Sequence, residues 1–250
     1  MSIAGIVWAQ MAADLVLLHG FTQTGGSWQP VREALAGRYR ALTPDLPGHG
    51  AFAERPASFS ATDAYLRAIV DGPYVLTGYS MGGRIALHAA LSLGARVTRL
   101  VLIGASPGLA DPAERAARRA DDDKLADRIE AIGVEAFVRE WSAQALFAGI
   151  PRGVAELADA DRRRNTAHGL AAALRGLGTG VMPPLWDRLP ELAHPVDLIV
   201  GERDEKFRAI AERMAAALPV ARMHVVPDAG HAVHLEAPSA VAAILGDKTP

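Results

Sequence analysis

The sequence predicts an α/β fold with a mostly parallel sheet, helices on both faces and a helical cap inserted into the core. Short apolar runs alternate with helix-type segments from residue 14 to about 106, and again from residue 195 onwards. Such alternation is typical of parallel sheets flanked by helices. Between the two stretches only helical patterns occur. The 250 residues, half of them hydrophobic, suit one such domain with an insertion.

The first alternating stretch supplies most of the predicted sheet. Its apolar runs are rich in Val, Leu and Ile, as expected of buried strands. Strands are expected at residues 14–18, 40–44, 75–77 and 99–104, with one edge strand at 3–10. The polar and apolar positions between them predict helices at 29–35, 60–71 and 85–91.

The inserted stretch and the final stretch complete the pattern. Residues 107–189 read as helices at 113–119, 124–132, 134–145, 154–164 and 169–177, and are predicted to form the cap. Residues 1–106 and 190–250 then form the core. In its second part, strands at 196–200 and 222–226 are followed by helices at 206–218 and 238–245. Caps of this kind exclude water and supply groups that select the substrate.

Composition narrows the function classes. A net charge of −2 gives no electrostatic reason to expect nucleic-acid binding. The absence of cysteine excludes disulfides, thiolate zinc sites and cysteine nucleophiles. Residues 1–10 lack the basic start and long apolar run of a secretory signal, and no segment approaches the ~20 apolar residues of a membrane span. We therefore expect a cytoplasmic protein without membrane insertion, acting as a monomer or a small homo-oligomer.

The most informative motif is Gly78-x-Ser80-x-Gly82, which lies between a predicted strand and a predicted helix. A chain that turns directly from a strand into a helix strains the residue at the corner, and glycines on either side prevent collisions. The turn lifts the serine hydroxyl clear of the sheet at the positive end of the helix. This arrangement is the nucleophile elbow of the α/β-hydrolase fold. The alternative is a glycine-rich turn with an idle serine.

The loop after the strand at 14–18 is predicted to lie near this serine. Loops at the carboxyl ends of parallel strands surround the ligand site. In this fold a backbone N–H of that loop, assigned here to Phe21, forms an oxyanion hole together with the N–H of the residue after the nucleophile, here Met81.

A serine hydroxyl needs an imidazole as its base and a carboxylate that orients the imidazole. The order Ser, Asp, His along the chain is the order that this fold uses. Asp204 follows the strand at 196–200 and His231 follows the last strand, so both reach the edge of the sheet where Ser80 lies. We assign Ser80 as the reactive hydroxyl, His231 as its base and Asp204 as the orienting carboxylate.

Other residues compete for these roles. Asp204 is surrounded by charged residues and is also compatible with an ordinary surface position. Asp228 lies only three residues before His231, which is a poor approach to the far ring nitrogen. His49 suits a structural loop, and His234 lacks the glycine that precedes His231.

Arg84 distinguishes the sequence from that of a generic esterase. It lies four residues after Ser80, and so on the same face of the helix one turn later. A guanidinium beside the nucleophile suits an anionic substrate, because it binds a carboxylate through two hydrogen bonds. The alternative is a buried arginine paired with a carboxylate of the core.

With these residues in view, the chain resembles the family of 2-succinyl-6-hydroxy-2,4-cyclohexadiene-1-carboxylate synthases, the lyases of menaquinone biosynthesis. The resemblance covers nearly the whole chain. Its more general motifs are residues 18–21 (LHGF), 45–50 (DLPGHG) and 230–231 (GH). Its more specific motifs are residues 78–84 (GYSMGGR), 107–109 (PGL) with 115–118 (RAAR), 137–141 (FVREW), 177–180 (LGTG) with 184–186 (PLW), and 201–208 (GERDEKFR).

The resemblance implies an elimination rather than an acyl transfer. That family releases pyruvate from 2-succinyl-5-enolpyruvyl-6-hydroxy-3-cyclohexene-1-carboxylate, a small polycarboxylate. By resemblance, Ser80 activated by His231 removes the ring proton next to the succinyl carbonyl. The match further implies Tyr79, Arg84, Arg118, Trp141 and Arg162 as substrate-binding residues, with Arg163 and Arg164 as alternatives to Arg162. No metal or organic cofactor is implied.

Two other functions remain open from the sequence. A carboxylic-ester or carbon–carbon bond hydrolase would use the same triad on the same fold. A binding protein without catalysis would not need the Ser80, Asp204 and His231 set. Arg84 favours the lyase over a hydrolase of neutral esters.

Overall fold

The computed structural model of the chain describes residues 14–69 and 72–247. Within these residues, six strands form one sheet, parallel throughout, in the order β2-β1-β3-β4-β5-β6. The strands are β1 (Asp14–Leu18), β2 (Arg40–Leu42), β3 (Tyr74–Tyr79), β4 (Val97–Ile103), β5 (Val196–Gly201) and β6 (Ala221–Val226). The predicted parallel α/β architecture is confirmed. The edge strand expected at 3–10 lies outside the described residues.

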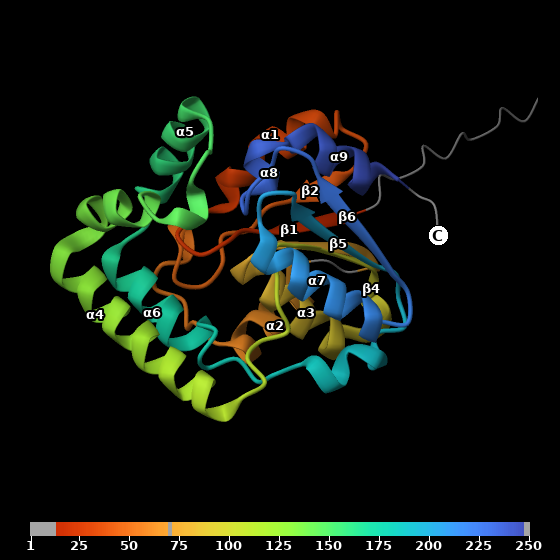
Figure 1. Ribbon diagram of the computed structural model, residues 1–250, viewed down its shortest axis with the longest axis horizontal. Helices are drawn as coiled ribbons and strands as arrows, with labels where there is room; N and C mark the ends of the chain where they lie inside the picture. The colour runs from red at the N-terminus through yellow and green to blue at the C-terminus, as the bar shows by residue number, and fades with distance from the viewer. Residues whose placement is uncertain (1–13, 70–71, 248–250) are drawn as a thin grey trace, which may run out of the picture.

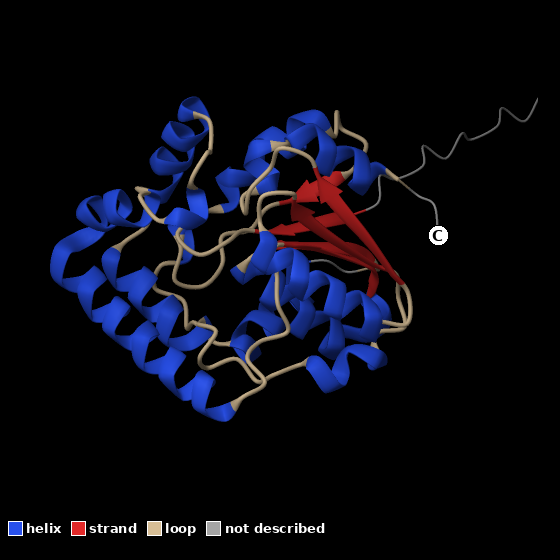
Figure 2. Ribbon diagram, in the orientation of Figure 1, coloured by secondary structure: helices blue, strands red, loops and turns tan. Residues whose placement is uncertain are grey.

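Helices cover both faces of the sheet (Figures 1 and 2). On one face lie α1 (Gln29–Ala34), α8 (Val233–Glu236) and α9 (Pro238–Gly246). On the other lie α2 (Phe59–Ile69), α3 (Met81–Leu93) and α7 (Glu205–Ala217). The one-turn helix α8 was not expected, because four residues are too few to show a helical period.

The buried side chains form a separate core on each face. Leu100 packs into the cluster that contains Ile85 of α3 and Met214 of α7. The next residue, Val101, packs into the cluster that contains Trp28 and Val241. Successive side chains of a strand point to opposite faces, so a strand covered on both sides is apolar along its length. This burial is why the strands were recognisable as continuous apolar runs.

Three helices lie between β4 and β5, away from the sheet: α4 (Pro112–Ser142), α5 (Arg152–Arg162) and α6 (Ala167–Leu177). Figure 1 shows α4 and α6 side by side. A third buried cluster joins these two helices and includes Ile129, Phe137 and Leu170. The inserted segment therefore has a small apolar core of its own.

Helix α4 differs from the prediction in one respect and agrees with it in another. The expected interruption at residues 120–123 is wrong, because the helix continues through them. Asp122 in this polar stretch is buried and accepts a hydrogen bond from Arg118 instead of ending the helix. The interruption expected at Gly133 is present as a kink, with φ 74° and ψ 167°. These angles are accessible essentially only to glycine.

No helix in residues 14–69 and 72–247 is both long and apolar enough to cross a membrane.

Candidate active site

Ser80 occupies the corner between β3 and α3. Its backbone angles are φ 50° and ψ −108°, a strained conformation for a residue with a side chain. The Ser80 N–H donates a 2.8 Å hydrogen bond to the carbonyl of Ile103, which holds the corner against β4. A Cβ atom on Gly78 would lie 2.2 Å from the carbonyl oxygen of Gly82, and one on Gly82 would lie 2.3 Å from that of Leu18. Glycine is therefore required on both sides of the serine.

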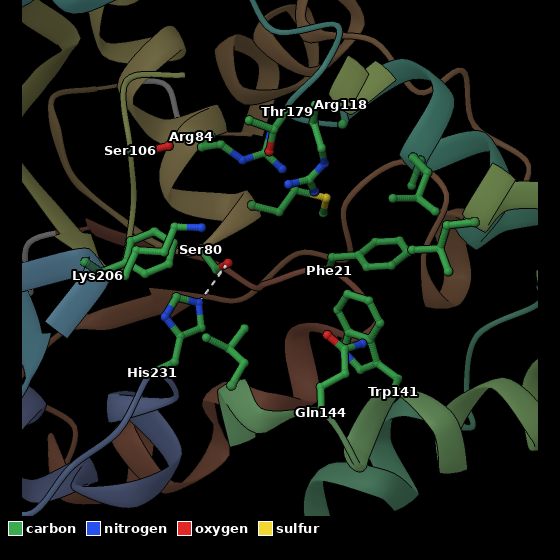
Figure 3. Close-up of a pocket in the computed structure, with 18 residues that line it drawn as sticks. Phe21, Ser80, Arg84, Ser106, Arg118, Trp141, Gln144, Thr179, Lys206 and His231 are labelled. Carbon is green, nitrogen blue, oxygen red and sulfur yellow. Dashed lines mark hydrogen bonds between the residues drawn. The ribbon is translucent and has the colours of Figure 1, made fainter. Parts of the chain in front are cut away.

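The structure brings Ser80, His231 and Asp204 together. The Nε2 atom of His231 lies 3.2 Å from the hydroxyl oxygen of Ser80 (Figure 3). On the opposite side of the ring, Nδ1 lies 2.6 Å from the Oδ2 atom of Asp204. Both His231 and Asp204 are buried. A carboxylate at Nδ1 holds that nitrogen protonated and leaves Nε2 free to accept the serine proton.

Asp204 is held in place by its position at the start of α7. Its side chain accepts a hydrogen bond from the backbone N–H of Phe207, as an N-cap residue does. The competing carboxylate, Asp228, is exposed on a separate turn, where its backbone N–H bonds to Glu202. His231 therefore pairs with Asp204 and not with Asp228.

The competing histidine, His234, lies behind the site. Its ring packs 4.2 Å from that of Tyr79 and 4.8 Å from that of Trp28, measured between ring centroids. It is fully buried, and neither ring nitrogen has a hydrogen-bond partner among the described residues. Burial, with smaller effects from nearby positive groups, lowers the pKa of His234 to about 3. His234 is therefore a neutral packing residue.

The loop after β1 brings Phe21 to the nucleophile. Thr22 in this loop has a positive φ of 70° and is fully buried. The N–H of Thr22 donates to His49, and its carbonyl accepts from the Nδ2 atom of Asn165. Burial lowers the pKa of His49, which keeps that ring neutral and able to accept. These contacts fix the strained loop.

Two backbone N–H groups near Ser80 are available to a ligand. Neither Phe21 nor Met81 donates its N–H to an acceptor within the described residues. Met81 is the first residue of α3, and the first N–H groups of a helix have no partner inside it. Both residues line the cavity beside Ser80. This is the arrangement needed to bind an oxygen that becomes negative during a reaction.

A cavity of about 370 Å³ opens above Ser80, between the sheet and the inserted helices. Its walls combine aromatic, hydroxyl and cationic side chains. The lining residues are Phe21, Ser80, Met81, Arg84, Gly104, Ser106, Arg118, Leu125, Trp141, Gln144, Leu146, Ala173, Leu174, Gly178, Thr179, Lys206, Phe207 and His231. The lining contains three cations and no carboxylate, so the cavity favours anionic ligands.

Arg84 and Arg118 lie next to each other on one side of the cavity (Figure 3). Arg84 donates a 2.8 Å hydrogen bond to the carbonyl of Leu177, and it pairs with no carboxylate among the described residues. Burial and the charge of Arg118 lower the pKa of Arg84 to about 10, so it remains charged at neutral pH. Arg118 donates to Asp122 at 2.7 Å. The alternative of an Arg84 paired with a core carboxylate does not apply.

Trp141 forms the opposite wall. Its ring packs edge-on against Phe21, with 5.2 Å between centroids. Its indole N–H is buried and has no acceptor among the described residues. An unpaired N–H beside the cavity is a donor available to a ligand.

Two of the residues implied by the resemblance lie outside the cavity lining. Tyr79 is buried beneath the site, with its ring 5.3 Å from that of His231, and burial raises its pKa. Arg162 is also buried and donates to Asp159 at 2.8 Å and to Ser142 at 3.1 Å. Its Nε atom lies 3.4 Å from the hydroxyl of Thr22, so Arg162 connects α5 to the loop that carries Phe21.

The alternatives to Arg162 do not line the cavity either. Arg163 is exposed and pairs with Glu135, and Arg164 is exposed and pairs with Asp161. Over residues 14–69 and 72–247, no group of three or more His, Asp or Glu side chains is placed to hold a metal ion.

The structure adds four polar lining residues that the sequence reasoning did not select. They are Ser106, Gln144, Thr179 and Lys206. The sequence position of Lys206 could have indicated that it lines the cavity. It lies two residues after Asp204, at the start of a helix that begins beside the site. The other three lie on loops or near helix ends, where no periodicity indicates a direction.

The chain is similar to known proteins over most of its length. A model of the alpha/beta hydrolase family matches residues 15–244. A Salmonella enteritidis protein named 2-succinyl-6-hydroxy-2,4-cyclohexadiene-1-carboxylate synthase is 37% identical over 92% of this chain and 91% of its own. A Bacillus subtilis protein whose name refers to the same synthase is 41% identical over 90% of this chain and 85% of its own.

Solved structures give the same result for the fold. MenH from S. aureus superposes with a TM-score of 0.89 at 33% identity, covering 94% of this chain and 92% of its own. A thermophilic esterase from Thermogutta terrifontis, with malate bound, superposes with a TM-score of 0.79 at 28% identity, covering 94% and 88%.

Proposed function

Because the chain belongs to the alpha/beta hydrolase family and, within it, to the 2-succinyl-6-hydroxy-2,4-cyclohexadiene-1-carboxylate synthases, we propose that it is the pyruvate-releasing lyase of menaquinone biosynthesis. Its substrate is 2-succinyl-5-enolpyruvyl-6-hydroxy-3-cyclohexene-1-carboxylate, which carries three carboxylates. The observation that supports this substrate best is the cavity over Ser80, which is lined by Arg84, Arg118 and Lys206 and by no carboxylate.

The reaction begins with the removal of a ring proton. The hydroxyl oxygen of Ser80 takes the proton from the carbon next to the succinyl carbonyl, while its own proton passes to Nε2 of His231. The 3.2 Å contact between the two atoms suits this transfer. Asp204, 2.6 Å from Nδ1, stabilises the imidazolium that forms.

The electrons of the broken C–H bond move first onto the succinyl carbonyl oxygen. The N–H groups of Phe21 and Met81 stabilise that negative charge. The charge then moves through the ring double bond and breaks the C–O bond to the enolpyruvyl group. That group leaves with the electron pair, and the proton held by His231 returns to it to give pyruvate, so atoms and charge balance.

The remaining residues bind and enclose the substrate. Arg84 and Arg118 bind carboxylate, and the indole N–H of Trp141 donates to a polar group of the ring system. Residues 107–189 form a cap that keeps water from the enolate, over a core of residues 1–106 and 190–250. Tyr79 and Arg162 support the site from behind. The protein works in the cytoplasm.

The deciding experiment is pyruvate release from freshly generated substrate, compared with a Ser80→Ala variant and a blank without enzyme. Rapid release that requires Ser80 is the expected result. Release no faster than the blank would exclude the lyase, and hydrolysis of a panel of esters and vinylogous diketones would then test the hydrolase alternative. A Ser80→Ala variant as active as the wild type would exclude both enzymes.

A further inference from the structure

Lys206 provides a third positive charge in the cavity, separate from the two arginines. It lies in the first turn of α7, two residues after Asp204. Figure 3 shows its side chain on the same side of the cavity as Ser80 and His231, facing Phe21 and Trp141 across the space. Arg84 and Arg118 occupy a third side, on α3 and α4. The cavity therefore has two cationic positions supplied by different elements.

The two positions differ in how firmly they are fixed. Arg84 is anchored to the carbonyl of Leu177, and Arg118 is anchored to Asp122. Lys206 is exposed at the edge of the cavity, and within the described residues no carboxylate pairs with it. The ammonium of Lys206 lies 5.7 Å from the centroid of the Phe207 ring. Phe207 in turn packs 4.5 Å from the ring of His231, measured between centroids.

The following inference rests on the proposed function. Two of the substrate's carboxylates remain in the cyclic product, and the third departs with pyruvate. We propose that Lys206 binds the carboxylate of the leaving enolpyruvyl group. The anchored arginines suit the carboxylates that remain in the cyclic product. The flexible, unpaired ammonium of Lys206, at the exposed edge of the cavity, suits the carboxylate that leaves with pyruvate.

This contact assists the step in which the C–O bond breaks. The departing fragment gains the electron pair as an enolate next to its carboxylate, until the proton on His231 neutralises it. A cation at that carboxylate stabilises the additional charge in a site partly closed to water. Lys206 is then a specificity residue for substrate over product, because only the substrate carries the third carboxylate.

The test compares Lys206→Met and Lys206→Arg with the wild type. Two quantities are measured: kcat/KM for pyruvate release, and the Kd of the isolated cyclic diacid product by calorimetry. For Lys206→Met we expect kcat/KM to fall roughly tenfold to a hundredfold, as expected for the loss of a charge-assisted hydrogen bond. The product Kd should remain within about twofold of the wild-type value, since the product lacks the carboxylate concerned. Lys206→Arg should restore much of kcat/KM.

A matched control is Lys124→Met, which removes an exposed lysine of α4 that pairs with Asp121 and does not line the cavity. It should change neither quantity. An unchanged kcat/KM in Lys206→Met would overturn the proposal. So would a product Kd that weakens in parallel with kcat/KM, because Lys206 would then bind a carboxylate that is retained. If the wild type released no pyruvate, the proposed function itself would be wrong. The wild-type assay gives that result before any variant is made, so the two failures can be told apart.

Discussion

The guanidinium of Arg84, on α3 of the core, donates a 2.8 Å hydrogen bond to the backbone carbonyl of Leu177, the last residue of α6 in the inserted segment. The neutral carbonyl of Leu177 thus orients the guanidinium of Arg84 without neutralising its positive charge, which remains available to bind an anionic ligand. We predict that Arg84→Ala lowers kcat/KM for pyruvate release by about a hundredfold. The fold should persist. The exposed Arg119→Ala, outside the cavity lining, is the matched control. Nearly unaltered release in Arg84→Ala would contradict the carboxylate-binding role.

The strained angles of Ser80 predict a conflict between stability and activity. Glycine adopts a φ of 50° without strain, so Ser80→Gly should raise the free energy of unfolding by about 1 kcal/mol. Ser80→Ala should give no such gain, because alanine keeps the Cβ atom. Both variants should lose pyruvate release. Urea unfolding of the two variants and the wild type measures the difference, and equal stabilities would show that the corner is not strained.

The pairing of His231 with Asp204 predicts a selective effect of amide substitution. Asp204→Asn no longer fixes the proton on Nδ1, so turnover should fall by a factor on the order of 100 to 10,000. Asp228→Asn, on the neighbouring exposed turn, should leave turnover unchanged. Steady-state rates of the two variants decide between the carboxylates. A larger loss in Asp228→Asn would reassign the orienting residue.

The neutral state of buried His234 predicts a loss of stability in mild acid. Its pKa is about 3 in the fold and about 6.5 in the unfolded chain, so below pH 6.5 protons bind preferentially to the unfolded state. His234 alone should cost about 2 kcal/mol of stability between pH 7 and pH 5. His234→Phe removes this cost and two unpaired nitrogens. The variant should therefore be more stable than the wild type, by an amount that grows as the pH falls. The exposed His168→Phe is the control, and an advantage independent of pH would contradict the argument.

Asp197 in β5 also predicts a loss of stability in acid, but at a lower pH than His234 does. It is fully buried and accepts hydrogen bonds from Arg99, Arg222 and His224. Burial alone would raise the pKa of Asp197, but the three donors outweigh it and hold the pKa below its usual value. Its stabilisation is therefore complete above the unfolded pKa of about 3.9 and is lost as the pH falls through the lower folded value.

Asp197→Asn should accordingly lower stability at pH 7 by about 3 kcal/mol, because it removes the buried negative charge that Arg99 and Arg222 contact. The difference from the wild type should narrow below about pH 4. Thermal unfolding across a pH series measures both effects, with Asp121→Asn in an exposed pair as the control. A constant difference at all pH values would contradict the role of the charge.

The sequence was most informative where local chemistry decides the structure. The central strands β1, β3, β4 and β5 are largely buried on both faces, so their apolar pattern was continuous. The glycines that flank Ser80 are required because a Cβ atom on either would lie 2.2 or 2.3 Å from a backbone oxygen. Arg84 was found from helical spacing alone. These features depend on a few neighbouring residues, and they were predictable for that reason.

Features set by distant contacts were not predictable. Arg162 lies at the end of α5, and nothing local indicates that its side chain turns to Ser142 and Thr22 instead of the cavity. Gln144 and Thr179 line the cavity because α4 and α6 pack together. The gap predicted at residues 120–123 contains three aspartates, and the sequence does not show that the carboxylate of one of them, Asp122, also accepts from the N–H of Gly180.

The kink at Gly133 has a consequence for the size of the ligand. Arg118 and Trp141 belong to the same helix and are 23 positions apart, so on a straight helix they would be separated by about 34 Å along the axis. Both line one cavity of about 370 Å³. The kink at Gly133, with φ 74° and ψ 167°, therefore bends one continuous segment so that it supplies two walls of the same cavity. The distance across the cavity between Arg118 and Trp141 therefore depends on the backbone angles of one residue, which has no side chain and does not line the cavity.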